Sequence, residues 1–174
     1  MSETGSTRPS RSGGWWFSPW RLPLVISTLV FMVDQWTKWL VLVSLDVGEF
    51  RPVFDSFFHL VHYRNTGAAW GMFEGKTFLL GLLSVIILAG MIWKFNSLAD
   101  GRRTRALGLA LIMGGTLGNV YDRFFRGEVV DFLLVFFRSF RWPAFNVADS
   151  AICCGVGLYL FSSVFFNDMS EKLP

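Results

Sequence analysis

The chain has 174 residues, of which 52% are hydrophobic and 17% are charged, and its formal net charge is +3. A soluble domain of this length cannot bury so much apolar surface in one core. The composition therefore argues against a soluble globular protein, and we expect lipid to surround most of the chain.

Four apolar stretches determine the expected fold, because a membrane-spanning helix needs about 20 mostly apolar residues. The stretches that meet this requirement lie at residues 22–43, 77–95, 105–124 and 144–166. We therefore expect an α-helical membrane protein with four transmembrane helices in a single domain, residues 21–168. Residues 1–20 are expected to form a disordered tail that ends in interfacial aromatic residues, and residues 169–174 a short C-terminal tail.

Asp34 and Lys38 lie in the first stretch, four residues apart and therefore on one face of a helix. Opposite charges that neutralise each other are the least costly way to place two ionisable groups near a membrane surface. We interpret them as a structural ion pair that orients the helix, with a direct catalytic role as the less favoured alternative.

Residues 46–76 form the longest connection between the expected spans. Residues 50–54 and 57–63 contain aromatic and alternating runs, which favour two short β-strands. Residues 65–67 have the composition of a turn, and residues 68–73 are small and apolar enough to lie flat on the bilayer surface. Long ordered loops usually carry binding surfaces or lids, so we expect this connection to belong to a functional site.

His59 and His62 are the only histidines in the chain and the first candidates for a metal site. Residues three apart on a strand point to opposite faces of the sheet. The sequence also contains no His-Glu-x-x-His and no Gly-x-Ser-x-Gly motif. We therefore expect no metal and no cofactor.

The third stretch ends in small and polar residues. Gly114 and Gly118 form a small-x-x-x-small pair, which allows close contact between membrane helices. Asn119, Asp122 and Arg123 follow at helical spacing and share a face. They are expected either to join helices by hydrogen bonds or to support a functional site, and both interpretations stay open at this point.

Asp131 and Asp149 are the strongest candidates for chemistry, because both lie in apolar surroundings where an ionisable group usually marks a functional site. Asp131 belongs to a strand-like run at residues 129–136. Pro143 suits the first turn of the fourth helix, which places Asp149 about two turns into that helix and near the surface from which Asp131 approaches.

Two carboxylates a few ångström apart cannot both ionise easily, so one holds a proton while the other stays anionic. Such a pair can activate water and protonate a leaving amine without a nucleophilic side chain. Aspartate pairs also occur in ion-coupled transporters. An aspartyl hydrolase and a proton-coupled transporter are therefore both compatible with these residues.

Cys153 and Cys154 are adjacent in the fourth stretch. Adjacent cysteines do not readily form a structural disulfide, and the residues around them are apolar. We expect both to be small, buried hydrophobic residues.

Five segments resemble the lipoprotein signal peptidase (signal peptidase II) family in their order and spacing. They are residues 34–38, 63–69, 114–123, 129–132 and 143–150. Each motif is weak alone, but five in register, with a matching chain length and four-span layout, are specific. The resemblance covers the whole chain except the N-terminal tail.

The resemblance implies a bacterial aspartic endopeptidase with a small periplasmic β-cradle and a lid-like surface helix formed by residues 46–76. The implied substrates are prolipoproteins whose lipobox cysteine already carries diacylglycerol, cut just before that cysteine. Asp131 and Asp149 match the catalytic pair. The positions that match substrate-binding or supporting polar residues are Asn65, Asn119, Arg123 and Asn146. The positions of more structural character are Asp34, Lys38 and Asp122.

Arg102, Arg103 and Arg105 crowd the short second loop, although the opposite loops contain more arginines in total. Because the positive-inside rule weighs short loops most, we expect a multi-pass protein with both termini in the cytoplasm. The resemblance implies that the membrane is the bacterial inner membrane. The active site then lies near the periplasmic face. The expected partners are prolipoproteins and membrane lipids, not nucleic acid, and the expected oligomeric state is a monomer.

Three rival functions make different predictions. A presenilin-like intramembrane aspartyl protease shares the Tyr121-Asp122 pair, but its Gly-x-Gly-Asp motif is missing and four spans are too few. A small transporter that uses Asp34, Asp131 and Asp149 as a proton relay predicts transport without cleavage. A non-enzymatic membrane assembly subunit predicts that Asp131→Asn is tolerated.

Overall fold

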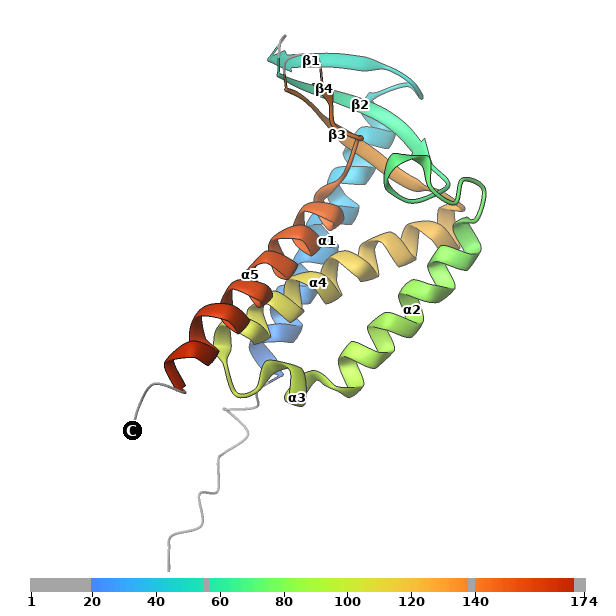
Figure 1. Ribbon diagram of the computed structural model, residues 1–174. Helices are drawn as coiled ribbons and strands as arrows, with labels where there is room; N and C mark the ends of the chain where they lie inside the picture. The colour runs from blue at the N-terminus through green and yellow to red at the C-terminus, as the bar shows by residue number, and fades with distance from the viewer. Residues whose placement is uncertain (1–19, 55–56, 138–139, 171–174) are drawn as a thin grey trace, which may run out of the picture.

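The computed structural model describes residues 20–54, 57–137 and 140–170, with side chains described up to Phe165. The expected N-terminal tail, apart from Trp20, and residues 171–174 of the expected C-terminal tail lie outside the described residues. The helices run side by side, and a small sheet lies at one end of them (Figure 1). The elements in chain order are α1 (Arg21–Ser44), β1 (Phe50–Phe54), β2 (Phe58–Asn65), the 3₁₀ turn η2 (Ala69–Gly71), α2 (Thr77–Trp93), α3 (Phe95–Ala99), α4 (Arg103–Tyr121), the π-helical turn η3 (Asp122–Arg126), β3 (Val129–Phe137), β4 (Phe140–Arg141) and α5 (Val147–Ser170).

Four long helices, α1, α2, α4 and α5, cover the stretches that were expected to span a membrane. Within the described residues, two helices are long and apolar enough to cross a bilayer, at Arg21–Ser44 and Val147–Phe165. Helix α2 is apolar but has only 17 residues, and α4 carries Arg103 and Arg105 in its first turn. The four-span topology therefore stays a prediction.

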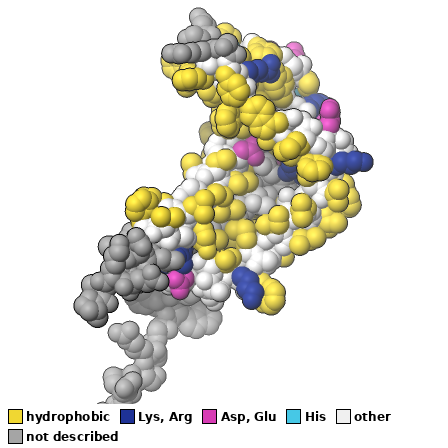
Figure 2. All heavy atoms as spheres, in the orientation of Figure 1, with side chains coloured by type: hydrophobic (Ala, Val, Ile, Leu, Met, Phe, Trp, Pro, Cys, Tyr) yellow, Lys and Arg dark blue, Asp and Glu magenta, His cyan; other side chains and the backbone are white. Residues whose placement is uncertain are grey.

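Large apolar side chains of these helices point away from the protein. Met32 of α1, Ile86 of α2 and Val164 of α5 each expose at least 60% of their surface. Apolar side chains cover much of the visible surface (Figure 2), as expected where the surrounding solvent is lipid. Cys153 and Cys154 are also exposed. The expectation that they are buried is wrong, because an apolar residue of a membrane helix can face lipid instead of a protein core.

Glycines bring α4 into close contact with its neighbours. A Cβ atom on Gly114 would lie 2.7 Å from the carbonyl oxygen of Ser27 in α1. Gly118, also in α4, lies directly against the carboxylate of Asp34, which belongs to α1 as Ser27 does. The predicted small-x-x-x-small contact is confirmed, and it lets the polar residues at the end of α4 reach side chains of α1 and α5.

The sheet consists of four antiparallel strands in the order β1-β2-β3-β4. The three strands expected from the sequence are confirmed, with small shifts at their ends. Pairing of β2 with β3 places Tyr63 opposite Asp131. Val130 and Phe132 of β3 pack against Val41 of α1 and Leu45, the residue that follows α1, which fixes the sheet to the end of the helices.

The segment before α5 is extended and not helical. Phe145 pairs with Leu133 of β3 through two backbone hydrogen bonds of 2.8 and 3.0 Å, and α5 begins only at Val147. The expected helix start at Pro143 is therefore wrong, because the backbone of this segment finds its partners in the sheet. As a result Asp149 lies in the first turn of α5.

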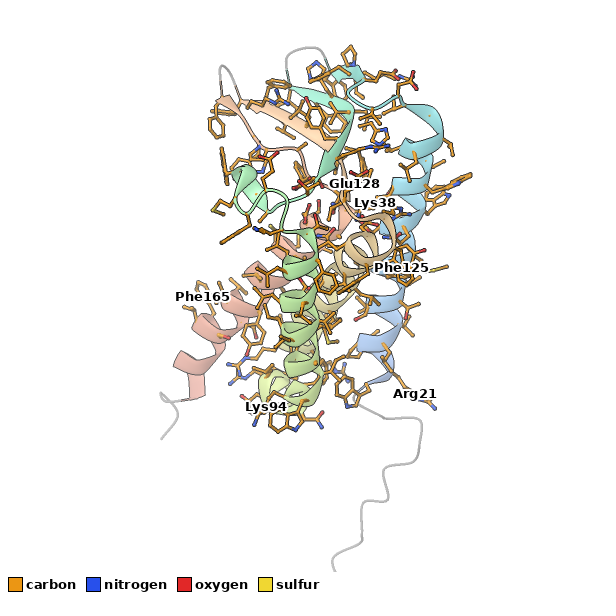
Figure 3. The ribbon with its side chains drawn as sticks, turned by 90° about the vertical axis from the view of Figure 1, so that its right-hand side faces the viewer. Arg21, Lys38, Lys94, Phe125, Glu128 and Phe165 are labelled. Carbon is orange, nitrogen blue, oxygen red and sulfur yellow. The ribbon has the colours of Figure 1, made fainter. Side chains whose placement is uncertain are left out.

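The opposite end of the helices has its own small core. Phe95 and Ala99 of α3 pack there with Leu109 and Met113 of α4, and Trp20 lies against them. Arg21 and Lys94 lie at this end, and Glu128 lies toward the sheet (Figure 3). The molecule thus has two distinct ends, of which only one carries the sheet.

Candidate active site

A cavity of about 330 Å³ lies where the sheet meets the helices. Its wall consists of the end of β2, the turn that follows it, Asp131 of β3 and the extended residues Pro143 and Ala144. Figure 2 shows a hollow below the sheet in which acidic and basic side chains are visible among apolar ones. Of the predicted site residues, Asn65 and Asp131 line this cavity. The others are not part of its wall and are joined to it through hydrogen bonds: Asn119, Arg123, Asn146 and Asp149.

Asp131 is held by amide groups from two other elements. Its Oδ2 accepts a hydrogen bond of 2.8 Å from Nδ2 of Asn65, and its Oδ1 accepts one of 2.8 Å from Nδ2 of Asn146. The Oδ1 of Asn65 in turn accepts the backbone N–H of Gly67 at 2.9 Å, which is the side-chain turn expected for this segment. The carboxyl is 3% exposed, although it borders the cavity.

Asp149 is part of the cap that begins α5. The Oδ1 of Asn146 accepts the backbone N–H of Asp149 at 2.9 Å, while Oδ2 of Asp149 accepts the backbone N–H of Asn146 at 3.2 Å. This reciprocal pattern satisfies two N–H groups that a helix start leaves free. The other oxygen of Asp149 accepts a hydrogen bond of 2.7 Å from Nδ2 of Asn119.

Asn146 connects the two carboxylates. Its side-chain amide binds Asp131, and its backbone N–H binds Asp149. The residue itself is completely buried. One rigid residue therefore fixes both carboxylates relative to each other.

Burial and, second, the negative charge of Asp149 raise the pKa of Asp131 from 3.8 to about 7. The hydrogen bonds from Asn65 and Asn146 lower this pKa but do not cancel the rise. Asp131 thus keeps a proton up to about neutral pH. A carboxyl with this behaviour beside a second carboxylate can exchange a proton during a reaction.

Arg123 adds a positive charge near the pair. Its guanidinium donates to two backbone carbonyls, that of Asn119 at 3.3 Å and that of Gly67 at 3.2 Å. Its charge acts on both Asp131 and Asp149. Arg123 therefore ties the end of α4 to the turn that lines the cavity.

Asp34, Lys38 and Asp122 form a separate group around the Lys38 ammonium. The Lys38 ammonium lies 2.8 Å from Asp34 Oδ2 and 2.7 Å from Asp122 Oδ2, and all three side chains are completely buried. The predicted pair of Asp34 and Lys38 is confirmed, but it lies in the protein interior and has Asp122 as a third member. Asn119 links this group to Asp149, because its Oδ1 accepts a hydrogen bond from Lys38 at 3.1 Å.

Sequence reasoning missed several contacts of the group around Lys38. Gln35 donates to Asp34 and Asp122 at 3.1 and 3.2 Å, and Arg126 donates to Gln35 and Asp122. Arg126 follows Asp122 at i+4, a spacing that predicts a helical ion pair and was available in the sequence. The spacing of Asn146 and Asp149 is likewise that of a capping box and would have given the correct start of α5.

No group of three or more His, Cys, Asp or Glu side chains that could hold a metal ion occurs among the described residues. His62 instead lies in the protein interior, where its Nδ1 is 2.9 Å from the carbonyl oxygen of Leu45. The expectation of a site without metal or cofactor stays a prediction.

Comparison with known proteins identifies the family. Residues 26–165 match the family model for signal peptidase (SPase) II. The chain belongs to the signal peptidase II family. It is 41% identical over 148 residues to a lipoprotein signal peptidase of Halalkalibacterium halodurans, with 85% of this chain and 94% of that protein covered. It is also 43% identical over 147 residues to the lipoprotein signal peptidase of Geobacillus kaustophilus, with 84% and 95% covered.

Solved structures support the signal peptidase II assignment at the level of the fold. A structure described as a bacterial membrane enzyme superposes with a TM-score of 0.78 at 32% identity, covering 87% of this chain and 92% of the other. A second structure with the same description has a TM-score of 0.74 at 32% identity, covering 83% and 93%. The chain is therefore a peptidase of the aspartic type known for signal peptidase II, and it belongs to a family of membrane enzymes.

Proposed function

We propose that this peptidase removes the signal peptide from diacylglyceryl-modified prolipoproteins by cutting just before the lipidated cysteine, with Asp131 and Asp149 as its catalytic pair. The observation that carries the proposal is the junction at Asn146, which binds both carboxylates, of which Asp131 lines the cavity. Asn65, Asn119 and Arg123 complete the site as supporting or substrate-binding groups.

The two aspartates take different roles in this mechanism. Asp149 accepts hydrogen bonds from Asn119 and from the Asn146 backbone, which hold both of its carboxylate oxygens in place. It takes a proton from a water molecule as that water attacks the scissile carbonyl. Asp131, whose pKa of about 7 keeps it protonated, polarises the carbonyl oxygen and supplies a proton to the leaving amine. No covalent intermediate forms, and the pair ends the cycle with the proton redistributed.

The proposed topology has four spans, α1, α2, α4 and α5, in one domain over residues 21–168. These helices lie side by side between the sheet and the α3 end (Figure 1). Arg21, Lys94 and the arginines at the start of α4 lie at the α3 end or in its loop, which the positive-inside rule places in the cytoplasm. The sheet and the cavity then face the periplasm of a bacterial inner membrane. The protein acts as a monomer.

The turn between β2 and α2 supplies the outer wall of the proposed site. Trp70, Met72 and Phe73 expose 59%, 54% and 63% of their surface. Trp70 also contacts the rings of Phe140 and Trp142, each at 5.9 Å between centroids, across the region where the cavity lies. We assign these side chains to the membrane surface, where they help to capture a lipid-anchored substrate.

The test is cleavage of a purified diacylglyceryl-modified prolipoprotein by the wild type, Asp131→Asn and Asp149→Asn. Each substitution keeps the side-chain volume but removes proton exchange, so we expect a loss of at least ~100-fold in rate. Insertion and thermal unfolding in detergent serve as the controls for folding. Normal processing by either folded variant overturns the catalytic pair.

The same assay tests the substrate. The lipid anchors the substrate and orients the scissile bond, so a prolipoprotein without diacylglycerol should be cut far more slowly. Equal rates for the two substrates would show that the site reads only peptide sequence.

A further inference from the structure

Asn119 lies between the two groups of carboxylates. The orientation of its side-chain amide determines whether an NH₂ group or an oxygen faces Asp149. The Oδ1 of Asn119 lies 3.1 Å from Nζ of Lys38, and its Nδ2 lies 2.7 Å from Oδ1 of Asp149. A reversed amide would present an oxygen to the Asp149 carboxylate and an NH₂ group to the ammonium. Both contacts would then be repulsive.

Lys38 determines the orientation of the Asn119 amide, because its ammonium requires an acceptor at this position. An ammonium has three N–H donors and no acceptor. Two of its donors point to Asp34 and Asp122, at 2.8 and 2.7 Å, and the third points to Asn119. The Nδ2 of Asn146 approaches the same Asn119 oxygen at 3.3 Å, which adds a second donor there.

We propose that Lys38 is a positioning residue for the catalytic pair: it fixes the Asn119 amide so that Asn119 donates a hydrogen bond to Asp149. This inference rests on the proposed function, since the direction of that hydrogen bond matters to the rate only if Asp149 takes the proton from water. Lys38 does not touch the substrate and acts through Asn119.

A second contact from the same buried group reaches the backbone beside Asp149. Oδ1 of Asp34 accepts the backbone N–H of Ala148 at 2.9 Å, while its Oδ2 binds Lys38. Ala148 lies in the first turn of α5, next to Asp149. The Lys38 group therefore holds Asp149 at two points, by its side chain through Asn119 and by its backbone through Asp34.

Charged groups face Asp149 from several elements. Asp131 approaches from β3 and Arg123 from the turn η3. Lys38 lies behind Asn119 in α1, with its partners Asp34 and Asp122. Arg123 donates to backbone carbonyls, so among these groups Lys38 is the one that controls the Asn119 amide.

The first experiment reverses the direction of the hydrogen bond without emptying the site. In Asn119→Asp, one carboxylate oxygen keeps the contact with Lys38 and the other faces Asp149, so kcat should fall by about 10- to 100-fold at neutral pH with little change in KM. As the pH falls, the new carboxyl gains a proton and can donate to Asp149. The ratio of variant to wild-type kcat should therefore rise with falling pH. The matched variant Asn119→Leu has neither a donor nor an acceptor, and its ratio should stay low at every pH.

The second experiment removes Lys38 while keeping the charge balanced. Asp34→Asn/Lys38→Met deletes one carboxylate with the ammonium, leaves Asp122 paired with Arg126, and retains an oxygen at position 34 for the Ala148 N–H. We expect a loss of kcat similar to that of Asn119→Leu, and no further loss when the two changes are combined. Thr37→Ala is the control on the same helix, because the Thr37 hydroxyl binds only carbonyls of its own helix at 2.9 Å, and it should cleave like the wild type.

The outcomes separate this inference from the proposed function. Cleavage by Asp149→Asn overturns the proposed function itself. If Asp149→Asn is inactive but Asn119→Asp keeps the wild-type kcat at neutral pH, or if the losses in the combined variant multiply, Lys38 does not act through Asn119. If the double variant cannot be obtained folded, the pH dependence of the Asn119→Asp ratio decides: a ratio that does not change with pH overturns the inference.

Discussion

The two groups of carboxylates differ in how their charge is compensated. Asp34 and Asp122 lie around the Lys38 ammonium at 2.8 and 2.7 Å, with no exposed surface. Asp131 and Asp149 receive their hydrogen bonds, within the described residues, from amide groups of asparagines and the backbone. The first group is enclosed by helices and by β3, whose Val130 N–H donates to Asp122, whereas Asp131 of the second group borders a cavity.

In the proposed mechanism, this difference separates structural carboxylates from reactive ones. A cation in contact fixes a carboxylate as half of an ion pair, and removing the cation leaves an uncompensated charge. Amide donors orient a carboxylate without neutralising it. Whether such a carboxylate is charged then depends on proton exchange with water or with a neighbouring acidic group. In the proposed mechanism, aspartate thus serves as a structural contact in the first group and as an acid or base in the second, and Asn119 joins the two groups.

The largest expected effect on stability comes from breaking the first group. Lys38→Met leaves Asp34 and Asp122 buried without their shared cation, and we expect a loss of about 3–5 kcal/mol in the free energy of unfolding. Asp131→Asn should cost far less, because it breaks no ion pair and Asp131 keeps a proton up to about neutral pH. Unfolding in detergent, with Thr37→Ala as the control, measures both. A Lys38→Met protein as stable as the control would contradict the comparison.

A smaller loss is expected where α4 approaches the first group. Gly118→Ala places a methyl group against the Asp34 carboxylate, and overpacking of this kind costs about 1–3 kcal/mol. A Cβ atom on Gly90 in α2 would meet no other atom within 4 Å, so Gly90→Ala should be neutral or slightly stabilising. Equal thermal stability of the two variants would show that the close contact is not required.

The pH dependence of stability tests the second group. The pKa of Asp131 rises from 3.8 to about 7 in the folded protein, so the native state binds more protons than the unfolded state between these values. The free energy of unfolding should therefore fall as the pH rises from about 4 to about 7. Above pH 7 the contribution of Asp131 no longer changes with pH. Asp131→Asn should flatten this part of the curve. Parallel curves of melting temperature against pH for the wild type and the variant would exclude Asp131 as the cause.

The smallest expected effect concerns substrate capture beside the second group. Trp70→Ala removes an exposed ring that contacts Phe140 and Trp142, and we expect the apparent KM to rise more than kcat falls. Trp93 is 81% exposed at the end of α2, near Lys94, so Trp93→Ala is the control and should leave both constants unchanged. A change confined to kcat would assign Trp70 to the chemical step.

Much of this architecture follows from local patterns in the sequence. Apolar runs located the long helices, alternating runs located three strands, and the spacing of Asp34 and Lys38 predicted their ion pair. The start of α5 was wrong because Pro143 fits a helix start equally well, and only the pairing of Phe145 with β3 decides against it. Contacts such as Lys38 with Asp122 join residues far apart in the chain, so no local pattern contains them.

The contact between Asp34 and the Ala148 N–H has a consequence for biosynthesis. Helix α5 is the last described helix to leave the ribosome, and the group that caps its second residue belongs to the first. Asp149 reaches its final place only after α1, α4 and α5 have met. A partly inserted chain therefore lacks an ordered pair of carboxylates, so under the proposed function it gains peptidase activity only after these three helices have assembled.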